Sequence, residues 1–391
     1  MDQHDAIGPR VGEAARARRR DRQARMSPGP ALTRRVGGPA GALVVADLGA
    51  TYLRVALARD GELGPVTRRH TTELSVDPSL GVTPGIVEAM REVLRAESNP
   101  GAAGAATLVE PLAIGLGVPA VVDDAGAVHW SLDIGVPAGT VMRDAIQAAF
   151  GVPVAVDNDA NLAVLGEHCQ GAGRGTRNFI LLTLGTNIGM GAVVDGQIFR
   201  GATGGAGEAG MLLVPVETIG PPTEPGGRRL VDAGRLGVGL SRAPEGYAWI
   251  EELVGGGALA LAAESWMATE ARAVGSLAGT TARKRPSARV FEQAVGGNPR
   301  AMELVDRAIE GWALMIANLI AVLDPDAIAL SGGLVGDIPP FLDQLRQRAT
   351  ELSRVPPRLI VAELGSRAGL VGAGIAAERA AGDHRMDEGA A

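Results

Sequence analysis

The chain has 391 residues, of which 46% are hydrophobic and 21% are charged, and its formal net charge is −7. This length and composition predict a folded protein of more than one domain and exclude a collagen-like or wholly disordered chain. The acidic balance disfavours nucleic acid as a partner. The single cysteine, Cys169, excludes an internal disulfide and an all-cysteine zinc site.

Residues 1–41 differ from the rest of the chain. They carry nine arginines against four acidic residues, together with four prolines. Such a segment cannot bury enough apolar surface to fold, so we predict a disordered basic tail. A basic arm for nucleic acid or another acidic partner is the alternative.

From residue 42 onward, strand and helix patterns alternate, which is typical of an α/β protein. Apolar residues recur with helical spacing at 84–95 and 141–150. Strand patterns occur at 42–48, 53–58, 112–118 and 154–156, and a hairpin is predicted at 121–128.

The second half of the chain begins in the same way, with predicted strands on both sides of a glycine-rich turn. A Pro- and Gly-rich stretch at 217–246 predicts a long loop. No apolar stretch reaches the ~18–20 residues that a membrane span needs, so we expect a cytoplasmic protein with no membrane partner. The predicted strands are 179–184, 192–194 and 327–330, the turn is 185–191, and the helices are 251–267, 299–323 and 370–381.

One pattern occurs twice: a strand, a Gly/Thr turn, a second strand and an Asp-Gly turn. The first copy runs from Leu48 to Gly61 and the second from Leu184 to Gly196. This repeat predicts two related halves that face a shared cleft. We divide the chain into the tail 1–41, a small α/β domain 42–163 on which residues 368–381 pack back, and a large α/β domain 164–367.

Three glycine turns follow predicted strands, and together they predict a nucleotide site. Glycine lets backbone N–H groups approach an anion closely, and threonine adds a hydroxyl donor. Any one of them taken alone is more simply an ordinary turn, and none is a P-loop, because the chain has no Gly-Lys-Ser/Thr. The candidate nucleotide ligands are Gly49, Thr51, Gly185, Thr186, Asn187, Gly189, Gly332 and Gly333.

Three acidic residues are candidates for the chemistry. Asp47 ends the first strand, where a carboxylate can hold Mg²⁺ directly or through water, or instead close its own turn. Asp159 opens a helix, where it can accept the proton of a substrate hydroxyl or serve only as an N-cap. Glu208 lies on the glycine-rich loop 201–210. There it can accept hydrogen bonds from sugar hydroxyls, or it can simply be an acid exposed to solvent.

Taken together, these residues resemble the ROK family of sugar kinases and sugar-responsive repressors, over residues 43–380. Residues 47–51 and 185–191 are similar to its two phosphate motifs, and residues 324–333 to its adenosine-side motif. Residues 157–161 are similar to its Glu-Asn-Asp-Ala-Asn signature. The resemblance implies the actin-like ATPase (ribonuclease H-like) fold, an α/β fold with two domains around a cleft.

The resemblance also assigns roles. It makes Asp159 the catalytic base and Asn158 a sugar ligand, with Glu208 and Glu251 as further sugar-binding acids. Gly117 and Pro119 belong to a segment that is similar to the sugar-side Gly-Val-Pro-Gly turn. Met211 stands where most members have a histidine, and the family's cysteine cluster is absent, so no zinc site is expected.

The implied function is an ATP- and Mg²⁺-dependent kinase that acts on a hexose such as glucose or an N-acetylhexosamine. A non-catalytic sugar sensor or regulator is the alternative, although 41 arginine-rich residues do not supply a DNA-binding domain. The third possibility is a kinase that uses a different phosphoryl donor, such as polyphosphate. The resemblance further implies a homodimer.

Overall fold

The computed structural model describes residues 41–49, 51–97, 109–131, 135–219, 243–274, 286–353 and 355–390. Residues 40–391 form one compact unit. The tail predicted over residues 1–41 lies outside the described residues, except for Gly41. None of the described helices is both long enough and apolar enough to cross a membrane.

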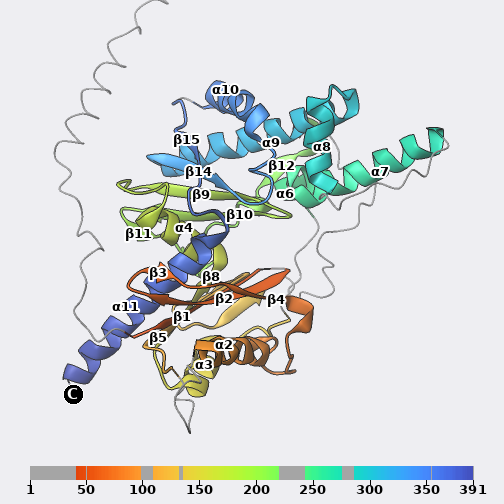
Figure 1. Ribbon diagram of the computed structural model, residues 1–391. Coiled ribbons are helices and arrows are strands. Elements are labelled where there is room, and N and C mark those ends of the chain that lie inside the picture. The colour runs from red at the N-terminus through yellow and green to blue at the C-terminus, as the bar shows by residue number, and fades with distance from the viewer. Residues whose placement is uncertain are drawn as a thin grey trace, which may run out of the picture. The chain divides into compact units, whose positions relative to one another are not determined.

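The first sheet has six strands, in the order β3-β2-β1-β5-β8, with β4 paired to β2. β1 and β2 form an antiparallel hairpin, whereas β1, β5 and β8 run parallel. Every residue of β1 and β5 is buried, because helices cover both faces of the sheet (Figure 1). The strands are β1 (Leu43–Leu48), β2 (Tyr52–Arg59), β3 (Glu62–Leu63), β4 (Thr67–His70), β5 (Ala113–Val118) and β8 (Val154–Asn158).

The two faces of the first sheet pack on different helices. Val44 and Ala46 of β1 share a core with α2 (Thr83–Glu97) and α3 (Met142–Phe150). The alternate residues Leu43 and Val45 share a second core with α4 (Asp159–Gln170) and α11 (Ala368–Ala390). Small residues bring these last two helices together, since a Cβ on Gly372 would lie 1.8 Å from the carbonyl oxygen of Leu162.

The second sheet has five strands, in the order β11-β10-β9-β14-β15. One face builds a core with the helices α6 to α10, and the other face packs against α4 through Val164. Helix α4 therefore contacts both sheets (Figure 1). The elements are β9 (Phe179–Leu184), β10 (Ile188–Val194), β11 (Gln197–Ile198), β14 (Ala327–Ser331), β15 (Leu359–Val361), α6 (Ile250–Val254), α7 (Gly256–Val274), α8 (Pro286–Val295), α9 (Pro299–Leu323) and α10 (Leu342–Leu352).

Two antiparallel ribbons lie outside these sheets. One joins β6 to β7 and the other joins β12 to β13. The second ribbon leads directly into α6, which carries Glu251. The remaining short elements are β6 (Ala120–Val122), β7 (Val128–Ser131), β12 (Leu213–Pro215), β13 (Tyr247–Trp249), α5 (Val216–Ile219) and the 3₁₀ turns Thr71–Glu73, Ala209–Met211, Pro339–Phe341 and Gly365–Arg367.

The internal repeat predicted from the sequence is present in the topology. Each sheet places an antiparallel hairpin beside two parallel strands, in the same order. In each sheet an Asp-Gly turn follows the hairpin and joins its second strand to the next strand, β2 to β3 and β10 to β11. The φ angles are positive, 51° and 79° at Asp60 and Gly61, and 53° and 79° at Asp195 and Gly196. These angles are typical of a type I′ turn, for which Asp-Gly is a preferred sequence.

Three predicted boundaries were wrong. The glycine-rich turn predicted at 185–191 ends early, because β10 begins at Ile188. The helix predicted at 251–267 is two helices that meet at Gly255. Within the predicted loop 217–246, residues 217–219 belong to α5, whereas 220–242 lie outside the described residues.

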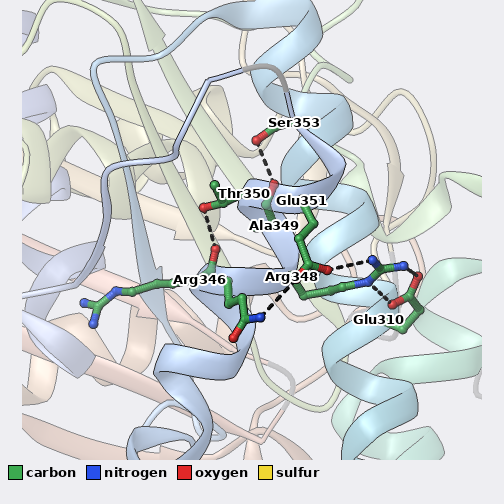
Figure 2. Close-up of polar contacts among 8 residues, drawn as sticks. Glu310, Arg346, Arg348, Ala349, Thr350, Glu351 and Ser353 are labelled. Atoms are coloured by element: carbon green, nitrogen blue, oxygen red, sulfur yellow. Dashed lines mark hydrogen bonds and ion pairs between the residues drawn. The ribbon is translucent and has the colours of Figure 1, made fainter.

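Helix α10, which the sequence pattern did not predict, is fastened to α9 by charged side chains. The Arg348 guanidinium binds both carboxylate oxygens of Glu310, at 2.6 Å from Nε and 2.8 Å from Nη2. Its Nη1 reaches Glu351 at 2.9 Å (Figure 2). The hydrogen bonds from Arg348 lower the pKa of Glu310. Ion pairs thus supplement a small apolar contact, in which Leu345 and Ala349 are buried and Leu342 is partly buried.

Candidate active site

Asp47 and Asp159 lie on either side of Gly117. Asp47 in β1 is the direct neighbour of Gly117 in β5. A Cβ on Gly117 would lie 3.5 Å from Asp47 Oδ1 and 3.4 Å from the Cα of Asp159. The glycine therefore leaves room for the two aspartates to approach one another, and the charge of Asp47 acts on Asp159.

Asp47 is buried within β1 rather than placed in a turn, and only 8% of it is exposed. Arg54, its partner across the β1–β2 hairpin, donates from Nη1 to Oδ2 at 2.8 Å. Burial raises the pKa of Asp47, and the charge and hydrogen bond of Arg54 act in the opposite direction. A Cβ on Gly369 would lie 3.0 Å from Asp47 Cγ, so the first turn of α11 also borders this carboxylate and favours its charge.

Asp159 is the first residue of α4, as the sequence predicted, but it is not the N-cap. Asn158 caps the helix, because its Oδ1 accepts hydrogen bonds from the N–H groups of Ala160 at 2.9 Å and Asn161 at 3.3 Å. The view of Asp159 as an ordinary cap was therefore wrong. Burial raises the pKa of Asp159 to about 7, and the charges of Asp47 and Glu208 add to the effect. A carboxylate with such a pKa is well suited to accept a proton near neutral pH.

Glu208 and Glu251 form a second pair of acids, and the charge of Glu208 also acts on Asp159. Burial raises the pKa of Glu208 to about 7, and the charge of Glu251 adds to this. Burial also raises the pKa of Glu251, whose Oε2 accepts a hydrogen bond from the Ile188 N–H at 3.3 Å. Glu208 is half-buried, so the view of it as a solvated loop acid was wrong. Carboxylates in this setting are ready to accept hydrogen bonds from hydroxyl groups of a ligand.

The hydrogen-bonding groups of Asn158 are largely used by the fold. Its Oδ1 serves as the helix cap, and its Nδ2 donates to the carbonyl oxygen of Ala120 at 3.1 Å. One hydrogen of Nδ2 remains for a ligand. Pro119 lies in the short bend between β5 and β6, next to this contact. Asn158 and Pro119, both predicted on the sugar side, are thus close to each other.

The glycine turns of the second half converge. Gly332, with a φ of 96°, lies so close to the end of β9 that a Cβ would stand 2.5 Å from the Leu184 carbonyl oxygen. The carbonyl oxygens of Gly185 and Thr186 accept hydrogen bonds from the first N–H groups of α7, Gly256 at 2.8 Å and Gly257 at 2.9 Å. Two turns and a helix N-terminus therefore meet. Because the Gly256 and Gly257 N–H groups are already bonded to the turn, α7 would favour a phosphate there through its dipole.

The remaining predicted nucleotide ligands lie in the two hairpins, except Gly333, which follows β14. Gly49 and Thr51 lie at the tip of the first hairpin, where the Gly49 N–H donates to the Tyr52 carbonyl at 3.0 Å and Thr51 is exposed. The Asn187 carbonyl accepts from the Gly185 N–H at 3.1 Å. Gly333 is exposed beside Gly332. Gly189 is in β10, not in the turn, and a Cβ there would lie 4.0 Å from the Ala160 side chain.

Arg54, Arg200 and the start of α7 are site features that sequence reasoning missed. Arg200 binds Asp157, the residue just before Asn158, through Nε at 2.9 Å and Nη2 at 2.6 Å. Arg54 lies directly opposite Asp47 in the β1–β2 pair and therefore on the same face of the sheet, a pairing that depends on the register of the hairpin. A surface cavity of about 460 Å³ lies elsewhere, on α2 and α3, and includes none of the candidate residues.

Asp47 fits a role in holding Mg²⁺. Mg²⁺ is bound in kinases by one or two carboxylates together with water and substrate phosphates, and Asp47 offers Oδ1 while Arg54 occupies Oδ2. Among the described residues, no three His, Cys, Asp or Glu side chains are arranged to hold a metal by themselves. A cluster of several cysteines is impossible in a chain with one cysteine.

Comparisons with known proteins find similar chains over most of the described α/β unit. The profile of the ROK family matches residues 44–380. A glucokinase of Halalkalibacterium halodurans is 33% identical over 269 residues, 67% of this chain and 75% of that enzyme. An N-acetyl-D-glucosamine kinase of Aliivibrio salmonicida is 30% identical over 66% of this chain and 78% of its own length. The solved structure of a ROK hexokinase from Thermus thermophilus, 27% identical, superposes with a TM-score of 0.60 and covers 88% of this chain and 99% of its own.

Proposed function

Because the chain belongs to the ROK family, we propose that it transfers the γ-phosphate of ATP to a hydroxyl group of a hexose. Relatives of 28–33% identity that are named as sugar kinases support an ATP-dependent sugar kinase. The fold is the actin-like ATPase fold of that family. The single observation that carries the proposal is the position of Asp159, the first residue of α4, across Gly117 from the Asp47 carboxylate.

In the proposed reaction, Asp159 accepts the proton of the sugar hydroxyl as that oxygen attacks the γ-phosphorus of ATP. The P–O bond to ADP breaks at the same stage, and the proton stays on the Asp159 carboxylate until solvent removes it. Mg²⁺, held through Asp47, would neutralise the charge on the phosphate oxygens. Arg54 keeps the Asp47 carboxylate oriented through its 2.8 Å hydrogen bond.

The sugar would be oriented by the acids beside the base. Glu208 and Glu251 accept hydrogen bonds from ring hydroxyls, and Asn158 donates its remaining amide hydrogen. Gly117 and Pro119 would border the sugar on the β5 side. The relatives' names favour glucose or an N-acetylhexosamine as the class of substrate.

The nucleotide would bind where the glycine turns converge. Exposed N–H groups and the Thr186 hydroxyl would contact the phosphates, together with Gly49 and Thr51 of the first hairpin. Gly185, Asn187 and Gly189 shape the second hairpin, and Gly332 and Gly333 would face the adenosine. The α7 N-terminus adds a favourable dipole toward the anion.

The proposal also covers the division into domains, the location of the protein and its oligomeric state. We propose that residues 42–163, with 368–381, form a small domain and that residues 164–367 form a large one, with the substrates held between them. A cytoplasmic location follows from the use of ATP as donor. A homodimer remains a prediction from the resemblance.

The test is phosphoryl transfer from ATP–Mg²⁺ to a panel of hexoses and N-acetylhexosamines, with Asp159→Asn compared with the wild type. We expect turnover on at least one sugar and a loss of ~10²–10⁴-fold in the variant. Asp144→Asn is the matched control, because Asp144 also lies in the first turn of a helix but its side chain is 69% exposed. No turnover with any sugar, despite ATP binding, would contradict an ATP-dependent kinase, and a sugar sensor would be favoured if polyphosphate also failed as the donor. Polyphosphate as donor is then the next trial.

A further inference from the structure

We propose that Arg200 and Asp157 form a latch by which the loop carrying Glu208 positions the segment carrying Asp159. This inference deepens the proposed function and rests on it. Arg200 and Asp157 would be positioning residues, since neither is placed to touch a reacting atom. They are 43 positions apart in the chain, so the contact exists only in the folded protein.

Asp157 has four hydrogen bonds on its two carboxylate oxygens. Oδ2 accepts from Arg200 Nε at 2.9 Å and Nη2 at 2.6 Å. Oδ1 accepts from the Asn158 N–H at 2.8 Å and from Asn161 Nδ2 at 2.9 Å. Asp157 and Asn161 are only 7% and 2% exposed, so water cannot easily replace these partners. A buried carboxylate with every acceptor site used holds its neighbours in one geometry.

The Oδ1 side of the latch orients the start of α4. Asn161, held by Asp157, also donates its backbone N–H to the Asn158 side chain at 3.3 Å. Asn158 in turn reaches Ala120 at 3.1 Å. Asp159 lies between these residues, so its position depends on the residues before and after it that Asp157 fixes.

The Oδ2 side of the latch reaches the sugar-side loop. The carbonyl oxygen of Arg200 accepts a hydrogen bond from the Ala206 N–H at 3.0 Å, which closes the loop two residues before Glu208. Gly201 supplies the positive φ of 73° that this closure requires. One arginine therefore fixes the loop through its backbone and the base segment through its side chain. Two N–H groups of its planar guanidinium converge on the single oxygen Oδ2, a geometry that the ammonium group of a lysine does not reproduce.

The latch makes a specific kinetic prediction. Loss of the Arg200 side chain should displace Glu208 and Asp159 relative to one another without removing either group. We expect Arg200→Gln to lower kcat by ~10–100-fold, as for an active-site misplacement of about 1 Å, and to raise KM for the sugar. KM for ATP should stay at the wild-type value, because no latch residue borders the glycine turns of the second half. Arg200→Lys should recover only part of the loss.

The experiment compares Arg200→Gln, Arg200→Lys, Asp157→Asn and the double variant Arg200→Gln/Asp157→Asn by steady-state kinetics. In a double-mutant cycle, the double variant should be no worse than either single one, because each change alone leaves its partner unpaired. Arg177→Gln is the control: Arg177 pairs with Asp195 at 2.7 Å on an exposed hairpin, and its loss should leave kcat unchanged. Equal kcat in Arg200→Gln and the control, or additive losses in the cycle, would overturn the latch.

Hydrogen exchange separates the latch from the proposed function. Amide exchange of a peptide spanning residues 154–162 should be faster in Arg200→Gln than in the wild type, and unchanged in Arg177→Gln. Unchanged exchange in Arg200→Gln would overturn the latch even if the wild type is an active kinase. An inactive wild type with faster exchange in Arg200→Gln would instead reject the kinase and keep the latch.

Discussion

The two equivalent hairpins, β1–β2 and β9–β10, differ in length and in the groups around their tips. In the first, Leu48 pairs with Leu53, so four residues form the tip. In the second, Leu184 pairs with Ile188, so three residues form it. This difference of one residue accounts for the unequal spacing of the two sequence motifs. The repeat is therefore one of topology, with the tips free to differ.

The chemical groups beside the two tips differ more than the backbones do. Asp47, Arg54 and Asp159 gather near the first tip, whereas the second is bordered by Gly332 and by the first N–H groups of α7. One fold used twice can thus supply charged side chains in one half and glycine turns beside a helix N-terminus in the other. Under the proposed function, the first half holds the metal and the base, and the second holds the phosphates.

The largest expected difference between the two hairpins concerns Asp47 and its counterpart in the second hairpin, Thr183. We expect Asp47→Asn to lower kcat/KM by about 10²–10³-fold and to raise the Mg²⁺ concentration needed for half-maximal rate. Thr183→Val should cost tenfold or less, because that position contributes no charge. Initial rates over a Mg²⁺ series measure both. Equal losses would contradict the division of roles between the halves.

A smaller effect is expected for Gly332 in the second half. Gly332→Ala forces a Cβ toward the Leu184 carbonyl oxygen at a φ of 96°, and should cost about 1–3 kcal/mol of stability. It should also raise KM for ATP while leaving KM for the sugar near its original value. Gly336→Ala is the control, because a Cβ there meets nothing within 4 Å. A change confined to the sugar KM would place the nucleotide away from this tip.

The raised pKa of Asp159 predicts a stability that depends on pH. Because its pKa is about 7 in the folded protein and 3.8 ordinarily, the folded state binds more protons than the unfolded state between these values. The contribution of Asp159 to stability therefore falls as pH rises through this window. Asp159→Asn should melt at a higher temperature than the wild type at pH 8, without Mg²⁺, and at the same temperature near pH 4. Thermal unfolding across this range is the measurement, and a variant less stable at pH 8 would contradict the burial of this charge.

The smallest effects are expected at the Asp-Gly turns, where the two halves are alike. Gly61→Ala and Gly196→Ala each place a side chain at a φ of 79° without any clash, so each should cost about 1 kcal/mol. Urea unfolding midpoints measure the cost, and kcat should not change. A clear difference between the two would show that the halves do not contribute equally to stability.

Local patterns predicted much of the fold, and they were wrong where tertiary contacts decide. The strand 179–184 has the predicted bounds. The start of β10 was missed because its glycines were expected to form a turn. A Cβ on Gly191 would lie 2.3 Å from the Ala160 carbonyl oxygen, so this glycine serves packing against α4. Helix α10 was missed because its sequence is mostly polar and its ion pairs to α9 come from a distant part of the chain.

The sequence by itself determined the two hairpins, the glycine turns and the placement of Asp159 at the start of a helix. These features depend on residues that are neighbours in the chain, such as an Asp-Gly pair or a strand followed by Asn and Asp. Only the tertiary structure decided that Arg200 pairs with Asp157 and that Asp159 and Glu208 have a pKa of about 7. The burial of these groups and their closeness to other charges arise when distant segments pack together, and no local pattern encodes them.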